Sequence, residues 1–246
     1  MGGGGGTATP PVDPLFVIRW YPVLLRVRTA TGAEEKPPAP EAKPDPAAAA
    51  AEEKAEDLGT LRGLELPRAT EEKPIFVYFH WPHEDGDRGR RIVKFCSGPL
   101  DDPLFIRVTP LFTCVEVNTK DSEQRLVEEA KVRNTPAVLV CRPDGTIVWR
   151  SDESALGGRA LAEALKGVLR SRFPAYWEGI EKQAAEQKKA FAEARRLLAA
   201  KRTEEAMGTL YPIVDSDVRF TDEWAQAVKI VREEEKRIEE ASKKAE

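Results

Sequence analysis

Cysteine and histidine are scarce in this chain of 246 residues, which holds three cysteines and two histidines. Cys96, Cys114 and Cys141 are widely spaced and form no Cys-x-x-Cys pair. This spacing excludes a disulfide framework and a four-thiolate zinc site. Unpaired cysteines are commonly buried apolar residues. We therefore interpret all three as core positions of a protein kept in reducing conditions, which favours the cytoplasm.

The chain also lacks a predicted membrane span and a clustered basic surface. Its apolar N-terminal stretch, 15–27, is interrupted by Arg19, Pro22 and Arg26, whereas a span needs about 20 mostly apolar residues. The same stretch lacks the features of a secretory signal, although a degenerate signal would instead imply export. The formal net charge is -4. Because no basic stripe interleaved with aromatics offsets this charge, a general nucleic-acid surface is excluded.

Sequence signatures of nucleotide and serine-hydrolase sites are missing as well. No glycine-rich phosphate loop follows a predicted strand. No Gly-x-Ser-x-Gly motif occurs, and His80 and His83 fall in one segment, so a serine triad would have no base elsewhere. Ordinary NTPase and hydrolase functions are therefore excluded, and no cofactor is expected.

Composition divides the chain into four predicted parts. Residues 1–30 hold an apolar segment, which we interpret as an added edge strand in preference to a short strand pair or a docking segment. Residues 31–60 are rich in Ala, Pro, Glu and Lys and predict a disordered linker, because they hold little that can be buried. Residues 61–172 alternate strand and helix signals, as an α/β domain does. Residues 173–246 have the composition of a helical extension.

The strands and helices of the α/β part are predicted from its apolar patterns. Strands are predicted at 75–80, 111–117, 137–141 and 147–149, with an Asp-Gly turn before the last strand. Helices are predicted from 87 to 96, at 122–132 and around 161–169.

Three more helices are predicted in the extension. The first runs from Pro174 and breaks near Lys201, the second covers about 204–214, and the third begins near Thr221. The first two resemble a tetratricopeptide-like helical hairpin, but one such unit is weak evidence, because a solenoid needs stacked repeats. The preferred interpretation is an amphipathic helical cap that packs on the α/β domain and ends in a charged tail.

Four segments together resemble the thioredoxin superfamily in content, order and spacing. They are Lys73-Pro-Ile-Phe-Val-Tyr-Phe, Asn134-Thr-Pro-Ala-Val-Leu-Val, Pro143-Asp-Gly-Thr-Ile-Val and Ala155-Leu-Gly-Gly-Arg-Ala-Leu-Ala-Glu-Ala-Leu. The resemblance implies an α/β fold, namely a thioredoxin-like domain with a central mixed sheet flanked by helices, here followed by an α-helical C-terminal extension. Such a resemblance says little about function.

The resemblance also marks where this sequence departs from the family. The two redox thiols of the family follow the first central strand, at the start of the next helix, where the helix dipole favours the thiolate. An ungapped comparison puts Glu84 and Asp87 at these positions, and a carboxylate cannot exchange with a disulfide. Tyr78 also stands where many members carry a buried acid. The resemblance therefore implies a redox-inactive member.

Two further features follow from the resemblance. Thr135 and Pro136 occupy the place of the family's cis-proline, beside the redox loop, and we predict a cis peptide bond between them. The alternative is a trans proline that starts a strand. The segment from Gly98 to Phe105 resembles the longer-loop members of the superfamily, in which it leads into a strand.

The segment 80–88 is the main candidate for a functional site. His80 and His83, with nearby carboxylates, offer donors for a divalent metal, but no third anchor is evident and no metal site is predicted. Helix capping and a solvated acidic loop explain these residues better. The candidate binding residues are Trp81, His83, Glu84, Asp87, Thr135 and Pro136.

The leading hypothesis is a non-catalytic binding or scaffold module that recognises a peptide or protein partner, with Trp81 as an aromatic anchor. One alternative is a thiol-disulfide oxidoreductase that uses Cys96 alone, with glutathione or a partner cysteine resolving the intermediate. Arg90 and Arg91 are close enough in sequence to activate that thiol. Another alternative is an adaptor that acts through its C-terminal helices. The sequence determines neither the partner nor the oligomeric state.

Overall fold

The structure, a computed structural model, describes residues 18, 20–22, 58–61, 73–80, 87–119, 124–151 and 157–245. Most of the predicted linker, residues 31–57, lies outside the described residues. Three candidate binding residues, Trp81, His83 and Glu84, also lie outside them.

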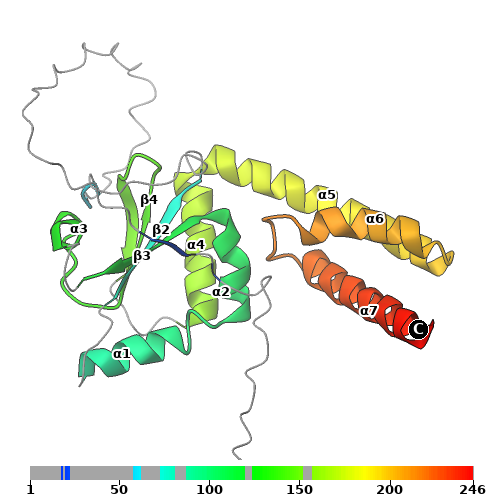
Figure 1. Cartoon of the computed structure of the whole chain (residues 1–246). Helices are drawn as coiled ribbons and strands as arrows, with labels where there is room; N and C mark the ends of the chain where they lie inside the picture. The colour runs from blue at the N-terminus through cyan, green and yellow to red at the C-terminus, as the bar shows by residue number, and fades with distance from the viewer. Residues whose placement is uncertain are drawn as a thin grey trace, which may run out of the picture.

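A mixed sheet of five strands forms the centre of the α/β part (Figure 1). The strands are β1 (Trp20–Pro22), β2 (Ile75–His80), β3 (Thr113–Asn118), β4 (Ala137–Cys141) and β5 (Ile147–Ser151), in the spatial order β1-β3-β2-β4-β5. β1 and β2 pair parallel with β3, whereas β4 pairs antiparallel with both β2 and β5. The continuous apolar run of β2 is buried because this strand has a neighbour on each side and helices over both faces. β1 takes the edge position that we preferred for the N-terminal segment.

Helices cover both faces of this sheet. On one face lie α1 (Asp87–Cys96), α2 (Pro103–Val108) and α4 (Gly158–Arg172), and on the other lies α3 (Gln124–Glu129). Alternate residues of a strand point to opposite faces. Accordingly, Phe76 and Tyr78 of β2 join the hydrophobic cluster under α1, α2 and α4, whereas Val77 and Phe79 join the cluster under α3.

Two elements differ from the sequence-based prediction. The segment between Gly98 and Phe105, expected as a loop, contains the start of α2. Asp102 caps this helix, since its Oδ1 accepts hydrogen bonds from the Leu104 and Phe105 amides at 2.8 and 3.2 Å. The second predicted strand begins at Thr113 rather than at residue 111, because Thr109–Leu111 forms a single turn of 3-10 helix, η4.

The α/β part also begins earlier than the predicted boundary at residue 61. Leu61 is buried in the cluster under α3, and its amide donates to the Gly145 carbonyl at 2.9 Å. Thr60 forms an isolated antiparallel bridge with Thr146. Residues 58–60 therefore belong with the sheet and not with the linker predicted for 31–60.

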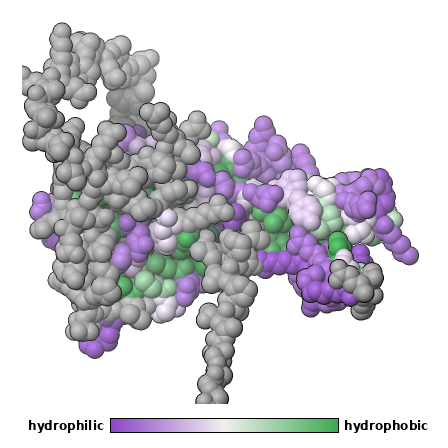
Figure 2. All heavy atoms as spheres, viewed as in Figure 1, coloured by the Kyte–Doolittle hydropathy of each residue, from purple (hydrophilic) through white to green (hydrophobic). Residues whose placement is uncertain are grey.

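The extension consists of α5 (Pro174–Ala199), α6 (Thr203–Val214) and α7 (Asp222–Ala245), which leave the α/β part together in one direction (Figure 1). These helices have a hydrophobic cluster of their own, centred on the fully buried Trp224. The start of α5 belongs to the α/β core instead, because Trp177 and Ile180 pack in the cluster under α4. Figure 2 shows that the visible surface of the extension is mainly hydrophilic.

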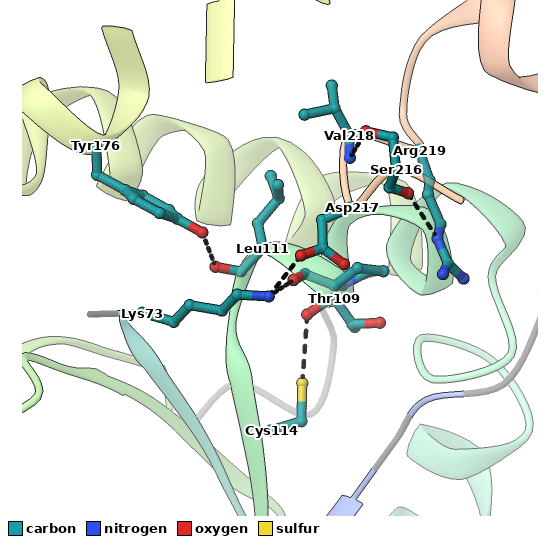
Figure 3. A network of polar contacts seen from close by, with 10 residues as sticks. Lys73, Thr109, Leu111, Cys114, Tyr176, Ser216, Asp217, Val218 and Arg219 are labelled. Atoms are coloured by element: carbon teal, nitrogen blue, oxygen red, sulfur yellow. Dashed lines mark hydrogen bonds and ion pairs between the residues drawn. The ribbon is translucent and has the colours of Figure 1, made fainter. Parts of the chain in front are cut away.

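Polar contacts dock the loop between α6 and α7 on the α/β part (Figure 3). Lys73 Nζ, immediately before β2, donates to Asp217 Oδ2 at 2.6 Å and to the Pro110 carbonyl at 3.1 Å. The Tyr176 hydroxyl donates to the Leu111 carbonyl at 2.9 Å. Burial, and secondarily the charge of Asp217, raise the pKa of Tyr176 to about 12, so this phenol remains a donor at neutral pH.

Aromatic contacts support the same docking. The Phe220 ring, in the loop between α6 and α7, stacks on Trp177 with ring centroids 6.0 Å apart. Lys166 Nζ of α4 lies 5.6 Å from the centroid of Phe220, within cation–π range. The loop therefore contacts both α4 and α5 and fixes the extension to the α/β part.

Candidate functional site

The carboxyl ends of β2 and β3 bring polar side chains together at one edge of the sheet. His80, the last residue of β2, pairs with Asn118, the last residue of β3, because these strands are parallel and in register. His80 Nε2 donates to Glu116 Oε1 at 2.9 Å. In open α/β sheets, ligands bind beyond the carboxyl ends of the strands. We therefore take this edge, with His80, Glu116, Thr135 and Pro136, as the candidate site, and call it the β2 edge.

The start of β4 contributes two of the predicted binding residues to the β2 edge. Ala137 pairs with Phe79 in the antiparallel ladder, which places Thr135 and Pro136 beside the end of β2. Pro136 is buried and Thr135 is half-buried. The peptide bond between them is cis, the geometry expected at this position.

The remaining candidate residues, Trp81, His83 and Glu84, lie outside the described residues, and of Asp87 only the backbone is described. That backbone is at the first position of α1. Among the described residues, no group of three or more histidine, cysteine or acidic side chains is arranged to hold a metal.

An aromatic stack supports His80 from the side of α1. Tyr78 stacks on His80 with centroids 5.2 Å apart and on Phe95 of α1 with centroids 5.5 Å apart. Trp20 of β1 lies 5.8 Å from the Tyr78 ring. Tyr78 and His80 share a face because they are two residues apart on one strand. The stack therefore orients the imidazole beside Glu116.

Cys96, the last residue of α1, lies behind this stack. Its Sγ is 3.3 Å from the Tyr78 hydroxyl, and the residue is half-buried, so the prediction that all three cysteines are core residues is wrong for Cys96. Burial, followed by the contact with Cys96, raises the pKa of Tyr78 above its usual range and keeps the phenol protonated. The carboxyl end of a helix carries partial negative charge, whereas thiols activated by a helix dipole lie at the amino end. Cys96, at the carboxyl end of α1, therefore gains no such activation from the dipole of its helix.

The remaining two cysteines are core residues, as predicted. Cys114 and Cys141 are 2% and 0% exposed, and burial raises the pKa of each thiol to about 12. Cys114 belongs to the cluster under α1 and α4, whereas Cys141 belongs to the cluster under α3. Since they point to opposite faces of the sheet, they cannot form a disulfide with each other.

Glu116 is the residue of this site that the sequence analysis missed. It is a charged residue within the strand Thr-Cys-Val-Glu-Val-Asn, whose other central residues are buried. A charge inside an apolar strand was the available signal, but its partner, His80, becomes evident only from the pairing of β2 with β3.

The hydrogen bond between His80 and Glu116 predicts a pH-dependent stability. The hydrogen bond from His80 lowers the pKa of Glu116 below its usual value of 4.5, so this carboxyl binds a proton more weakly in the folded than in the unfolded state. The contribution of the Glu116 carboxylate to the free energy of unfolding is therefore fully present above pH 4.5. It is lost as the pH falls through the lowered pKa of Glu116. We expect Glu116→Gln to reduce the free energy of unfolding by up to about 1 kcal/mol at neutral pH, because the pair is partly exposed.

Urea unfolding of the wild type and of this variant across the acidic range tests the prediction. The difference between the two proteins should shrink as the pH falls through the lowered pKa of Glu116. Glu178→Gln, at an exposed position on α5, is the matched control and should show no such trend. If the free energy of unfolding differs between the wild type and Glu116→Gln by the same amount at every pH, the pH dependence does not come from the Glu116 carboxyl.

Comparisons with known proteins show one weak structural likeness and no family. No protein-family model and no curated protein matches the chain. Among solved structures, the chain is similar to one titled DsbH oxidoreductase, with 20% identity, a TM-score of 0.36, and coverage of 41% of this chain and 75% of that chain. Within the described part, no helix is long and apolar enough to cross a membrane. From its strand order, strand directions and flanking helices, the chain is a thioredoxin-like α/β domain with an α-helical C-terminal extension.

Proposed function

We propose that this protein is a redox-inactive, thioredoxin-like binding or scaffold module that recognises a peptide or protein partner at the β2 edge. The observation that carries the proposal is the position of the three thiols. Cys96 ends α1, whereas Cys114 and Cys141 are buried within β3 and β4. The sequence has no cysteine between His80 and the first turn of α1, where the resembled family carries its redox pair.

Without a redox pair, the β2 edge keeps features suited to binding. The backbone at its end is fixed, because the His80 carbonyl accepts hydrogen bonds from the Thr119 amide at 2.9 Å and the Thr119 hydroxyl at 3.1 Å. Trp81 follows directly on this fixed residue in the sequence. Thr135 lies just before β4, whose first residue, Ala137, pairs with Phe79 of β2. Tryptophan is enriched among the interface residues that dominate binding energy, which makes Trp81 the candidate anchor.

The thiol chemistry of the protein tests the first half of the proposal. We expect no catalysed reduction of insulin by dithiothreitol, because the chain lacks a dithiol pair. In native protein, a thiol reagent should modify Cys96 first, whereas Cys114 and Cys141 should react only after denaturation, since burial raises the pKa of both to about 12.

The control for this experiment is Cys96→Ser. The half-exposed position of Cys96 beside the Tyr78 hydroxyl is the observation that favours the alternative, an oxidoreductase using one cysteine. Insulin reduction by the wild type that disappears in Cys96→Ser would establish this alternative and reject the redox-inactive assignment.

Partner capture tests the second half of the proposal, namely that a peptide or protein partner binds at the β2 edge. We expect Trp81→Ala to reduce recovery of a co-purified partner at least tenfold, because truncation of an interface anchor typically costs about 2 kcal/mol or more. Tyr211→Ala, which removes an exposed aromatic of α6 far along the chain, is the control and should leave recovery unchanged. Equal recovery with wild type and Trp81→Ala would reject the β2 edge as the binding surface.

A further inference from the structure

A second concave surface lies in the helical extension, between α5 and α6. This α5/α6 groove has a volume of about 240 Å³. Its lining residues are Gln183, Glu186, Gln187 and Ala190 from α5 and Thr209, Pro212, Ile213 and Ser216 from α6 and its end.

The floor of the α5/α6 groove is fixed before any ligand binds. Gln187 is only 6% exposed and both ends of its amide are satisfied. Its Nε2 donates to the Val218 carbonyl at 3.0 Å, and its Oε1 accepts from the Thr221 hydroxyl at 3.0 Å. Because the buried Gln187 side-chain amide makes both of these hydrogen bonds, it holds α5 rigidly against the loop that follows α6. Ile213 and Ala190 supply the apolar part of the groove.

Pro212, which lines the groove, leaves one carbonyl of α6 without its usual donor. It lies inside α6 and has no N–H, so the Gly208 carbonyl, four residues earlier, lacks the donor that an α-helix normally provides. Gly208 is exposed, and a Cβ built there would meet no atom within 4 Å. The backbone at Gly208 is therefore open to close approach by another chain.

The charge of the groove selects a cationic ligand. Glu186 is the one charged residue in its lining. In the part of the chain that the structure describes, no ion pair involves this exposed carboxylate, although Lys182 and Lys189 lie on the same helix. The Gln183, Thr209 and Ser216 side chains in the lining also carry oxygens that can accept hydrogen bonds. A ligand that matches this surface combines an apolar stem with a cationic, donor-rich end.

We propose that the α5/α6 groove binds a lysine- or arginine-containing segment of a partner protein. The aliphatic stem lies on Ala190, Pro212 and Ile213, as the stems of such side chains commonly lie on apolar surface. The charged end binds Glu186, and an N–H of the segment donates to the Gly208 carbonyl. This site is separate from the β2 edge, so it stands or falls independently of the proposed function.

A selection of short linear peptides displayed on phage, against the full chain, tests this proposal. We expect selected sequences to be enriched in lysine or arginine, and measure their binding by fluorescence anisotropy. Thr209→Trp fills the groove from a half-buried position and should weaken binding at least tenfold. Glu186→Gln keeps the size of the side chain and should weaken binding about two- to fivefold, with a flatter salt dependence.

Two controls separate this site from other surfaces. Glu178→Gln, on the same helix but outside the groove lining, should bind the peptides as wild type does. Trp81→Ala should also bind normally, because it alters only the segment after β2. The proposal is overturned if no peptide is selected, if peptides with norleucine in place of lysine bind equally well, or if Glu186→Gln and Thr209→Trp leave the affinity unchanged.

Discussion

Replacement of Trp224 by alanine is expected to lower the free energy of unfolding by about 3 to 5 kcal/mol, the range for removing a large buried side chain. Trp224 of α7 is 0% exposed and packs with Leu210 and Ile213 of α6 and with Phe191 of α5. Its Nε1 also donates to the buried Val214 carbonyl at 3.1 Å. The variant therefore loses both the packing that joins the three helices and a satisfied hydrogen bond.

Chemical unfolding followed by circular dichroism measures this effect. Trp224→Phe is the matched control, since it keeps most of the apolar volume and removes the indole donor. We expect it to cost about 1 to 3 kcal/mol, the penalty for leaving a buried acceptor unsatisfied. A loss below 1 kcal/mol for Trp224→Ala would mean that the three helices of the extension do not depend on this cluster.

Substitution of Gly158 by alanine is expected to have the second largest effect. A Cβ at Gly158, the first residue of α4, would lie 2.0 Å from Asp102 Cβ and 2.8 Å from the Pro99 carbonyl oxygen. Neither distance is possible, so Asp102 must move and release the amides that it caps at the start of α2. Overpacking costs about 1 to 3 kcal/mol and a lost cap about 1 kcal/mol, so the expected loss of stability is about 2 to 4 kcal/mol.

The neighbouring Gly157 provides the control for this prediction. A Cβ there would meet no atom within 4 Å, and its φ of -66° suits any residue. Gly157→Ala should therefore change the free energy of unfolding by less than about 0.5 kcal/mol. The double variant Gly158→Ala, Asp102→Ala should lose less free energy of unfolding than the two single variants lose together, because both substitutions remove the same cap. Equal losses of stability for Gly157→Ala and Gly158→Ala would refute the close approach of Gly158 to Asp102 and Pro99.

Most of the regular elements were predicted from local patterns. The run Ile75–His80 is buried on both faces and is a central strand, and the apolar spacing of α4 to α7 marks real helices, because side-chain periodicity depends on neighbours in sequence. The missed helix, α2, also had a local signal. Asp102 followed by Pro103 is a typical helix start, but the family resemblance led to the expectation of a loop there.

The sequence by itself determined most of the strands and helices and the absence of a Cys-x-x-Cys pair, since each depends on residue types and their spacing along the chain. Tertiary structure alone decided which distant residues meet. The pairing of β2 with β3 joins His80 to Glu116, the packing of α1 on the sheet brings Cys96 to Tyr78, and the crossing of α5 with α6 forms the groove around Glu186. These contacts depend on strand register and helix packing, which are set by the burial of the whole core and leave no trace in the spacing of residues.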